Sequence, residues 1–333
     1  MSGYRVAVVG ATGAVGSTML ALLGQRGFPA TEVVPFASER SVGRELDGGL
    51  AVRALEEEAI AGFDVALLSA GSGVAREWAP RFAAAGAVAV DNSSCWRMEP
   101  DVPLVVAEVN PEAIESQRGI VANPNCSTMQ MVVALKPIHD SAGVERIVVS
   151  TYQSTSGTGQ RAVDELLDQS HAMLHEMEPP APGAYPHRIA FNVLPQVETF
   201  RDGDDYTTEE RKMMAETRKI LGDDSLRISA TCVRVPVPRC HSESINVQTR
   251  EDLSPAQCRE LLASAPGVAV LDDPANGIYP LASEAAGRDE VFVGRIRRDP
   301  SSPRTLNLWV VSDNLRKGAA TNAVQIVEGL AGG

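Results

Sequence analysis

The sequence is poor in cysteine, in basic side chains and in long hydrophobic runs. Its five cysteines form no Cys-x-x-Cys pair, and their odd number favours reduced thiols over a disulfide framework. The 30 basic and 43 acidic residues give a net charge of −13, which argues against binding to nucleic acid or to an anionic membrane surface. No stretch reaches the roughly eighteen apolar residues of a membrane span. The N-terminus carries no basic region or cleavage site, so we expect a cytoplasmic protein.

Length and composition are those of a globular protein with about two domains. The chain has 333 residues, of which 44% are hydrophobic, and a domain usually takes about 100 to 200 residues. The pattern of strands and helices changes after Cys126, which predicts a boundary close to that residue.

The first half opens with a strand, a glycine turn and a helix in that order. Residues 4–9 form a β-branched run, followed by Gly-Ala-Thr-Gly-Ala-Val-Gly and an apolar helix pattern. Such glycines let the backbone approach the pyrophosphate of a dinucleotide, which the helix N-terminus then holds. The alternative is a strand-turn-helix without a ligand. The predicted cofactor-binding residues here are Gly10, Thr12, Gly13, Ala14, Val15 and Gly16.

The segment after the second predicted strand, residues 32–37, should lie near the adenosine ribose. An NAD site usually has an acidic residue here, whereas this chain has Ser38, Arg40 and Ser41. Two hydroxyls and a guanidinium suit a 2′-phosphate, so we expect NADP. Glu39 argues the other way, and the alternative is a solvated loop.

Two further predicted strands, residues 64–69 and 87–90, end in small or polar residues. Strands that alternate with helices imply a parallel sheet whose carboxyl ends line the ligand crevice. We therefore expect an α/β fold for the first half, a Rossmann-type doubly wound parallel sheet, with Ser69 and Gly71 among the cofactor-binding residues.

A lone cysteine, Cys126, stands between the turn formers Asn-Pro-Asn and a long apolar run. The run predicts a buried helix that ends near Pro137 and begins at the cysteine. A helix N-terminus favours the thiolate, the form of cysteine that attacks a carbonyl carbon. The alternative is a buried structural cysteine, since free cysteine is commonly buried.

The second half has longer strands with fewer helices between them, which predicts an α+β domain with a mixed or antiparallel sheet. The proline-rich segment at residues 177–188 is predicted to form a loop. Residues 314–330 are predicted to form a helix that packs back on the first domain. The predicted strands are residues 146–153, 227–237, 244–250, 290–298 and 305–311.

Six motifs occur in a fixed order along the chain. They are Gly-Ala-Thr-Gly-Ala-Val-Gly at 10–16, Asp-Asn-Ser-Ser at 91–94, Asn-Pro-Asn-Cys-Ser-Thr at 123–128, Ser-Thr-Tyr-Gln at 150–153, Arg-Val-Pro-Val-Pro-Arg-Cys-His-Ser-Glu-Ser at 234–244, and Val-Val-Ser-Asp-Asn-Leu at 310–315. Together they resemble the aspartate-β-semialdehyde dehydrogenases from the N-terminus to about residue 331. That family often has glycine, and sometimes alanine, directly before the histidine, where this chain has Cys240.

The resemblance implies an enzyme that reduces β-aspartyl phosphate to aspartate β-semialdehyde and phosphate with NADPH. It implies a nucleotide domain at residues 1–124, completed by a C-terminal helix at 313–333, and a catalytic and dimerisation domain at 125–312. Cys126 would form an acyl thioester. His241 would be the acid/base partner, since an imidazole titrates near neutral pH, and Gln153 would orient the substrate.

The resemblance also assigns binding residues and a homodimer or homotetramer. Arg234 would hold the substrate α-carboxylate through a bidentate fork, and Glu209 the α-ammonium group. Lys212 and Arg97 would contact phosphate; for Glu209 and Lys212 the alternative is an ordinary i,i+3 ion pair. Asn125 is the remaining substrate-binding residue, and Ser156, Gly157 and Asn314 complete the cofactor site.

Three other interpretations stay open. His171 and His175 have the i,i+4 spacing of zinc peptidases, but the glutamate after the first histidine and a third ligand are missing, so we expect no metal. The chain is alternatively another acyl-phosphate or semialdehyde dehydrogenase of the same fold. A non-catalytic homologue that serves as a binding protein would be expected to lack the cysteine or the histidine.

Overall fold

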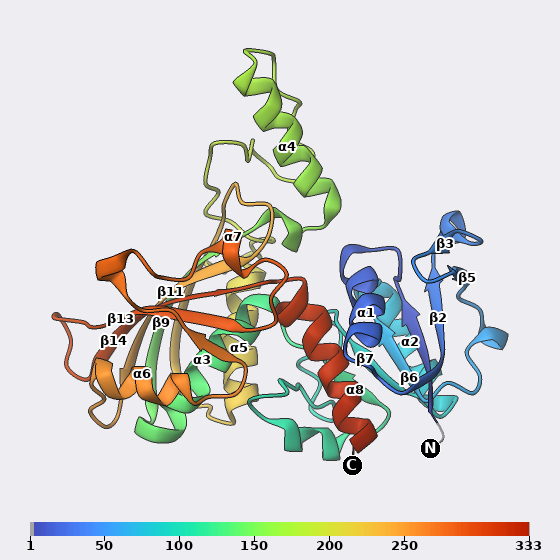
Figure 1. The fold of residues 1–333 in the computed structure, drawn as a ribbon, viewed down its shortest axis with the longest axis horizontal. Helices are drawn as coiled ribbons and strands as arrows, with labels where there is room; N and C mark the ends of the chain where they lie inside the picture. The colour runs from blue at the N-terminus through green and yellow to red at the C-terminus, as the bar shows by residue number, and fades with distance from the viewer. Residues whose placement is uncertain (1–2, 333) are drawn as a thin grey trace. The chain divides into compact units, whose positions relative to one another are not determined.

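The computed structural model describes residues 3–332 and divides the chain into two compact units (Figure 1). The first unit comprises the chain up to Asn125 together with the part from Ala319 on, and the second runs from Cys126 to Gly318. Residues 313–318, expected in the nucleotide domain, therefore belong to the second unit.

The first unit is built on a parallel six-stranded sheet with helices on both faces. Its first strand is buried on both sides: Val6 and Val8 pack into one core cluster with α1 and α8, whereas Ala7 and Val9 pack into another with α2. The doubly wound fold predicted for this half is confirmed. The sheet order is β5 (Arg53–Ala54), β2 (Ala30–Ala37), β1 (Tyr4–Val9), β6 (Val65–Leu68), β7 (Val88–Asp91) and β8 (Ile120–Ala122), and the helices are α1 (Ala14–Gln25), α2 (Ser72–Ala84) and α8 (Asn322–Gly332).

The last helix, α8, is part of the first unit's core although almost two hundred residues separate it from the rest of that unit. Its first residue, Asn322, donates to the carbonyl of Val105 at 2.8 Å and to Asn123 Oδ1 at 2.7 Å. It also accepts the N–H of Ala107 at 3.0 Å. Apolar residues such as Val324 and Val327 then pack on the side of α1.

The second unit contains a mixed six-stranded sheet, as predicted. The pairs β9/β10 and β12/β13 are parallel and the other pairs antiparallel. Helices α3 (Cys126–Ala142), α5 (Thr208–Leu221) and α6 (Pro255–Ala263) cover one face (Figure 1). The sheet order is β10 (Arg227–Arg234), β9 (Val144–Gln153), β11 (His241–Thr249), β14 (Thr305–Ser312), β13 (Val291–Arg298) and β12 (Val268–Val270).

Three predicted boundaries in this unit are wrong. The strand predicted at residues 227–237 ends at Arg234. Helix α3 continues through Pro137 to Ala142, because a proline removes a single N–H donor while Ile138 and Ala142 beyond it remain buried. Strand β11 begins at His241, not at residue 244, because His241 already pairs with Ser312 of β14.

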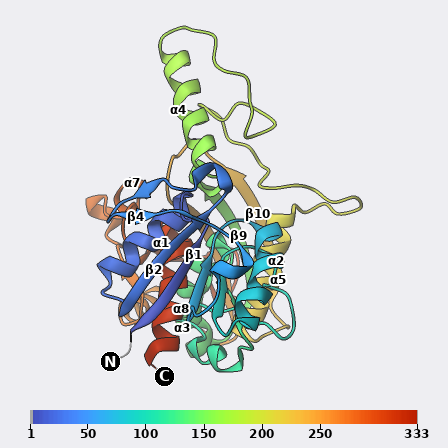
Figure 2. The same ribbon diagram turned by 90° about the vertical axis from the view of Figure 1, so that its right-hand side faces the viewer.

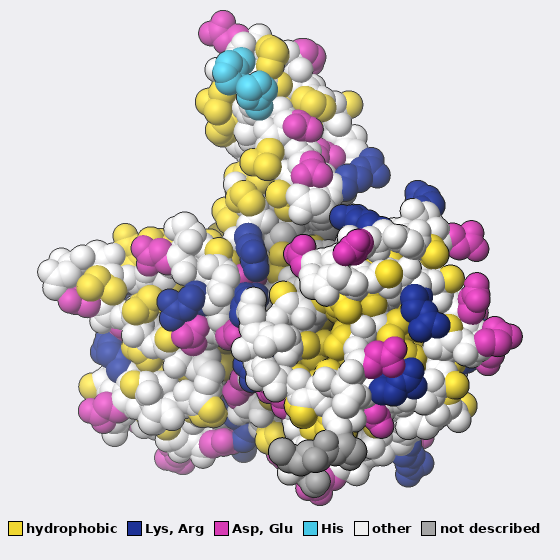
Figure 3. All heavy atoms as spheres, turned by 45° about the vertical axis from the view of Figure 1, so that its right-hand side comes forward, with side chains coloured by type: hydrophobic (Ala, Val, Ile, Leu, Met, Phe, Trp, Pro, Cys, Tyr) yellow, Lys and Arg dark blue, Asp and Glu magenta, His cyan; other side chains and the backbone are white. Residues whose placement is uncertain are grey.

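Helix α4 (Gln160–Leu174) projects from the second unit together with the loop that follows it (Figures 1 and 2). The loop includes the proline-rich segment and has no regular structure there, as expected. Glu165 accepts N–H groups of Gly183 and Ala184, which ties the loop to the helix. Hydrophobic side chains gather on this projecting segment (Figure 3), among them the exposed Leu167, Leu174, Met177, Phe191 and Val193.

Over residues 3–332, no helix combines the length and the apolar character that crossing a membrane requires.

Candidate active site

Cys126 is the first residue of α3, immediately after the Asn-Pro-Asn turn. Its side chain is half-buried, and the dipole of the helix start favours its thiolate. Gly318 packs against it, since a Cβ on Gly318 would lie 2.9 Å from the Cβ of Cys126. A half-buried thiol at a helix N-terminus has the surroundings of a nucleophile.

His241 is the first residue of β11, and its side chain is fully buried. Its Nδ1 accepts the backbone N–H of Ser154 at 3.0 Å and lies 3.1 Å from the Ser154 hydroxyl. Burial, and then the Arg234 guanidinium, lower the pKa of His241 to about 3. Both causes favour the neutral imidazole.

Asn314 connects the turn before His241 to the turn after β9. Its Oδ1 accepts the backbone N–H of Cys240 at 2.9 Å and the hydroxyls of Ser154 and Ser156, each at 3.1 Å. Cys240 has a φ of 74°, in the left-handed region that glycine favours. The amide of Asn314 thus holds the backbone just before the imidazole and two serine hydroxyls after β9.

The same asparagine lies next to the cysteine. A Cβ on Gly318 would be 3.6 Å from the Cβ of Asn314, as well as 2.9 Å from that of Cys126. A chain of contacts therefore runs from Cys126 past Gly318 to Asn314, and through the hydroxyl of Ser154 to His241. The structure brings the predicted nucleophile and the predicted acid/base residue into one network.

Gln153 and Arg234 end two paired strands, and each is the other's register partner. Arg234 is 5% exposed, and its Nη1 donates to the carbonyl of Ser154 at 2.6 Å. A Cβ on Gly157 would lie 2.9 Å from Arg234 Nη1 and 3.2 Å from His241 Nε2. Gly157 therefore packs directly against both groups.

The α5 residues Glu209 and Lys212 lie near Gln153. Glu209 is 3% exposed, and its Oε1 accepts from Gln153 Nε2 at 3.1 Å. Lys212 Nζ lies 3.8 Å from Glu209 Oε2 and forms an ion pair with Glu198. The ordinary i,i+3 pair is thus present, alongside a buried carboxylate that contacts the predicted substrate-orienting amide.

The glycine loop of the first unit forms a cradle that only glycine allows. Gly10 has a φ of 83°, and a Cβ on it would lie 2.5 Å from the carbonyl oxygen of Ser69. A Cβ on Gly16 would lie 2.2 Å from the Gly10 carbonyl oxygen. Gly13 caps α1 without a side-chain hydrogen bond, so the helix start can accept a phosphate. These features fit a dinucleotide pyrophosphate.

The other predicted residues of the first unit lie in three places. Ser38, Arg40 and Ser41 belong to an exposed turn after β2 that contains a short 3-10 helix. Gly71 caps α2 with a φ of 86°. Thr12, Ala14 and Val15 lie in the loop and the first turn of α1, with Thr12 partly exposed and Val15 partly buried.

Arg97, a predicted phosphate-binding residue, is 7% exposed in the first unit. Its guanidinium donates to the backbone carbonyls of Asn123 at 2.9 Å and Asn92 at 3.0 Å. These bonds fix its position. Asn125, which closes the first unit, is 6% exposed.

One buried group near the site was not predicted. Glu243 is fully buried two residues after His241 and therefore on the same face of β11. Neither of its oxygens makes a hydrogen bond among the described residues. Burial raises its pKa well above the usual value; the nearby amide of Gln130 opposes part of the rise, and Glu209 adds to it. The alternation of a strand would have identified this residue if the start of β11 had been known.

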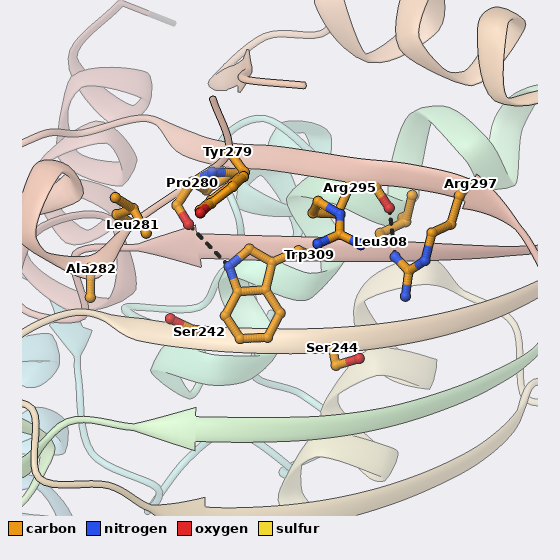
Figure 4. Close-up of a pocket in the computed structure, with 10 residues that line it drawn as sticks. All are labelled: Ser242, Ser244, Tyr279, Pro280, Leu281, Ala282, Arg295, Arg297, Leu308 and Trp309. Atoms are coloured by element: carbon orange, nitrogen blue, oxygen red, sulfur yellow. Dashed lines mark hydrogen bonds between the residues drawn. The ribbon is translucent and has the colours of Figure 1, made fainter. Parts of the chain in front are cut away.

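The opposite face of the sheet carries a hollow of about 410 Å³ (Figure 4). Ser242 and Ser244 point to it, whereas His241 and Glu243 point to the helix-covered face. The indole of Trp309 donates to the carbonyl of Pro280 at its rim. This hollow is therefore separate from the cluster around His241.

The exposed His171, in the last turn of α4, and His175, directly after that helix, have ring centroids 4.2 Å apart. Across the described part of the chain, no three His, Cys, Asp or Glu side chains form a group that could hold a metal ion.

Comparison with known proteins gives a match for each unit. The model described as "Semialdehyde dehydrogenase, NAD binding domain" matches residues 5–117, and "Semialdehyde dehydrogenase, dimerisation domain" matches residues 135–317. The first unit is therefore a dinucleotide-binding domain and the second a dimerisation domain.

Relatives match over nearly the whole length. The chain is 55% identical to the aspartate-semialdehyde dehydrogenase of Aquifex aeolicus, with 98% of this chain and 97% of that protein covered. It is 52% identical to the Legionella pneumophila enzyme, with 97% and 94% covered.

Solved structures agree with these matches. Aspartate semialdehyde dehydrogenase II from Vibrio cholerae has a TM-score of 0.96 at 46% identity and 99% coverage of both chains, and the same protein is also known in complex with ASA. The Candida albicans enzyme with NADP has a TM-score of 0.76 at 27% identity and 99% coverage of both. With this identity over the full length, and with Cys126 and His241 in one network, the chain belongs to the aspartate-semialdehyde dehydrogenase family.

Proposed function

We propose that this protein catalyses the reversible reduction of β-aspartyl phosphate to aspartate β-semialdehyde and phosphate with NADPH. This is a step in the aspartate-derived pathway to lysine, threonine, methionine and isoleucine. The observation that carries the proposal is Cys126 at the start of α3, connected through Asn314 and Ser154 to the buried His241. The family membership supplies the substrate.

Cys126 is the covalent catalyst in this proposal. Its thiolate attacks the acyl carbon, phosphate leaves, and an enzyme thioester remains. The nicotinamide supplies the hydride that reduces this thioester. Gln153 orients the substrate. His241 is the acid/base residue that exchanges a proton with the oxygen of the reacting carbonyl.

The charged residues hold the two ends of the substrate. Arg234 binds the α-carboxylate, since its planar fork matches a carboxylate, and Glu209 binds the α-ammonium group. Lys212 and Arg97 contact the phosphate, with Asn125 beside the cysteine. A protein of net charge −13 needs such local cations for an anionic substrate.

Replacement of Cys126 tests the reaction. Cys126→Ala should lower phosphate-dependent NADP reduction with aspartate semialdehyde by several orders of magnitude, with NADP binding intact. Cys95→Ala removes a second half-buried thiol and should retain most of the activity. A Cys126→Ala rate above about a tenth of wild type contradicts the thioester route. Activity with glyceraldehyde 3-phosphate or N-acetylglutamate semialdehyde in place of aspartate semialdehyde would favour another dehydrogenase of the same fold.

For the cofactor we propose NADP rather than NAD. Arg40, between Ser38 and Ser41, supplies a guanidinium for the 2′-phosphate, and Gly10 to Gly16 hold the pyrophosphate. Ser69 and Gly71 at the end of β6, and Ser156, Gly157 and Asn314 of the second unit, complete the proposed cofactor site.

The exposed arginines after β2 offer a direct test of cofactor choice. Removing a charge-assisted hydrogen bond costs about 1.5 to 3 kcal/mol, so Arg40→Ala should raise the KM for NADP about tenfold or more and leave that for NAD nearly unchanged. Arg44→Ala, four residues further along the same exposed segment, is the control. Equal losses for NADP and NAD would make Arg40 a structural residue.

The assembly we propose is a homodimer or homotetramer through the dimerisation domain. The sheet face around Trp309, which α3, α5 and α6 leave uncovered, supports this proposal, as does the domain match. Sedimentation equilibrium gives the number of 35.3 kDa chains per particle.

A further inference from the structure

Arg234, which we assign to the substrate α-carboxylate, is held by the segment that projects from the second unit. After β9 the chain forms α4 and its long loop, and it returns beside β10 at Leu194. There the N–H of Leu194 donates to the carbonyl of Arg234 at 2.9 Å, and the N–H of Arg234 donates to the carbonyl of Leu194 at 2.8 Å. The end of the projecting segment thus fixes the main chain of Arg234.

The guanidinium of Arg234 contacts an aromatic ring of the same segment. Its Cζ atom lies 5.7 Å from the ring centroid of Tyr185. A guanidinium within about 6 Å of a ring centroid is attracted by the negative face of the ring, most strongly where water is excluded. Arg234 is buried and Tyr185 is half-buried, so this attraction acts largely away from solvent.

Tyr185 is itself fixed in position. Its hydroxyl donates to Thr158 Oγ1 at 3.0 Å. Glu165 of α4 accepts the N–H groups of Gly183 and Ala184, directly before the tyrosine, at 3.0 and 2.6 Å. The ring packs against the small core cluster of this segment, which consists of Leu166, Ile189, Ala190 and Leu194. The loop therefore presents the ring to Arg234 in a defined place.

One edge of the Arg234 guanidinium is left for a ligand. Nη1 donates to the carbonyl of Ser154 at 2.6 Å. Nε is buried and makes no hydrogen bond within residues 3–332. A carboxylate held by two parallel hydrogen bonds would therefore meet the edge formed by Nε and Nη2. The direction of this edge depends on the groups that pack against the guanidinium.

We propose that Tyr185 is a positioning residue that determines specificity, because its ring holds the Arg234 guanidinium with the edge of Nε and Nη2 directed at the α-carboxylate of the semialdehyde. The proposal rests on the proposed function and deepens it, since it assigns part of the substrate selectivity to the projecting segment. Tyr185 acts through Arg234 and does not itself bind the substrate.

This role predicts an effect on one substrate only. Tyr185→Leu keeps an apolar side chain in the core cluster but removes the ring and the hydroxyl. The KM for aspartate semialdehyde should rise about three- to thirtyfold in phosphate-dependent NADP reduction. The KM values for phosphate and for NADP should stay within about twofold of wild type, because other residues bind these ligands. A rise in all three KM values, or in none, overturns the proposal.

Tyr185→Phe separates the ring from the hydroxyl. It keeps the ring over Arg234 and loses only the hydrogen bond to Thr158. The KM for the semialdehyde should stay within about twofold of wild type. A loss equal to that of Tyr185→Leu would assign the effect to the hydroxyl and contradict the role of the ring.

Tyr206→Leu is the matched control. Tyr206 is a second tyrosine of this unit that contacts an arginine, with Arg211 Cζ 4.6 Å from its ring centroid. Its loss should change the semialdehyde KM less than about twofold. A rise as large as that of Tyr185→Leu would show that the effect is not specific to the ring beside Arg234.

A double-mutant cycle tests whether Tyr185 acts through Arg234. In an Arg234→Gln background the guanidinium is absent, so Tyr185→Leu should lower kcat/KM for the semialdehyde by less than about twofold further. Losses that multiply in the double variant would overturn the proposal.

An NMR measurement without substrate or cofactor keeps this proposal separate from the proposed function. In protein with ¹⁵N-labelled arginine, Arg234→Gln identifies the Nε–H signal of Arg234 by its loss. That signal should shift in Tyr185→Leu, which removes the ring current, and keep its position in Tyr206→Leu. An unchanged signal in Tyr185→Leu overturns the proposal whatever the activity, whereas a wild type that does not turn over the semialdehyde refutes the proposed function.

Discussion

Cys240 has a left-handed backbone conformation at the residue directly before His241, with a φ of 74°. That conformation costs an L-residue roughly 1 to 2 kcal/mol, and glycine almost nothing. The hydrogen bond from its N–H to Asn314 holds it in place. This hydrogen bond therefore keeps the residue before the imidazole in a strained conformation.

This strain predicts an inverted order of stability for two variants. Alanine is usually better than glycine in a folded chain, but here Cys240→Gly should have a free energy of unfolding about 1 kcal/mol above that of Cys240→Ala. Both variants lose the buried thiol, so its packing cancels in the comparison. Urea denaturation measures the difference, and a more stable alanine variant would show that the φ of Cys240 stores no strain.

At the residue scale, motifs pointed to Cys126 and His241 because their chemistry depends on residue type. Ser154 could not be predicted, because its contribution is a backbone N–H that any residue except proline would supply. Glu243 was missed because β11 was predicted to begin at residue 244, which left the alternation of His241 and Glu243 outside the strand.

At the scale of elements, the start of α5 holds Glu209 and Lys212 through a buried capping box. Glu210 accepts the N–H of Thr207 at 2.7 Å and, with its other oxygen, the N–H of Cys232 at 2.9 Å. Cys232 lies on β10, two residues before Arg234. A single carboxyl group thus fixes both the helix and the strand that carry predicted substrate-binding residues.

Removal of this group should therefore cost more than removal of an exposed capping residue. Glu210→Ala leaves two buried N–H groups without acceptors and should lower the free energy of unfolding by about 2 to 4 kcal/mol. Gln257→Ala, in the exposed capping box of α6, is the matched control and should cost about 1 kcal/mol or less. Similar losses in chemical denaturation would mean that the Cys232 bond contributes nothing.

Among the elements, the errors include the end of α3, the end of β10 and the start of β11. Proline is a reliable signal for the end of an exposed helix. Around Pro137, however, the burial of Ile138 and Ala142 outweighs the lost hydrogen bond. Such burial depends on partners far away in the sequence, which local patterns do not contain.

At the scale of the whole molecule, Glu243 links protonation to stability. Its pKa is raised in the folded protein, so the folded state keeps a proton that the unfolded state loses above about pH 4.5. Its contribution to stability is therefore complete below that pH and is lost as the pH rises toward the folded pKa.

Glu243→Gln should remove this dependence, because the amide cannot ionise. The free energy of unfolding of the variant minus that of wild type should be nearly constant below pH 4.5 and rise above it, by at most about 1.4 kcal/mol per pH unit. Urea titrations at pH 4, 5.5 and 7 would measure this slope. A flat difference over this range contradicts a neutral Glu243.

The two-part organisation was predictable, because a parallel sheet between helices and a mixed sheet with long strands have different sequence patterns. The strand order of the second sheet was not. It depends on pairings such as β11 with β14, whose partners lie more than fifty residues apart, and no local signal specifies them.

The place of α8 in the first unit sets an order for synthesis. On a ribosome, the N-terminal 125 residues emerge long before Val324 and Val327, which cover the α1 side of their sheet. The second unit is continuous in sequence and can fold while the chain is still being made. The dinucleotide-binding unit must wait with one apolar face open until α8 has been made, so a chain that stops before α8 would contain a complete catalytic sheet and no finished cofactor site.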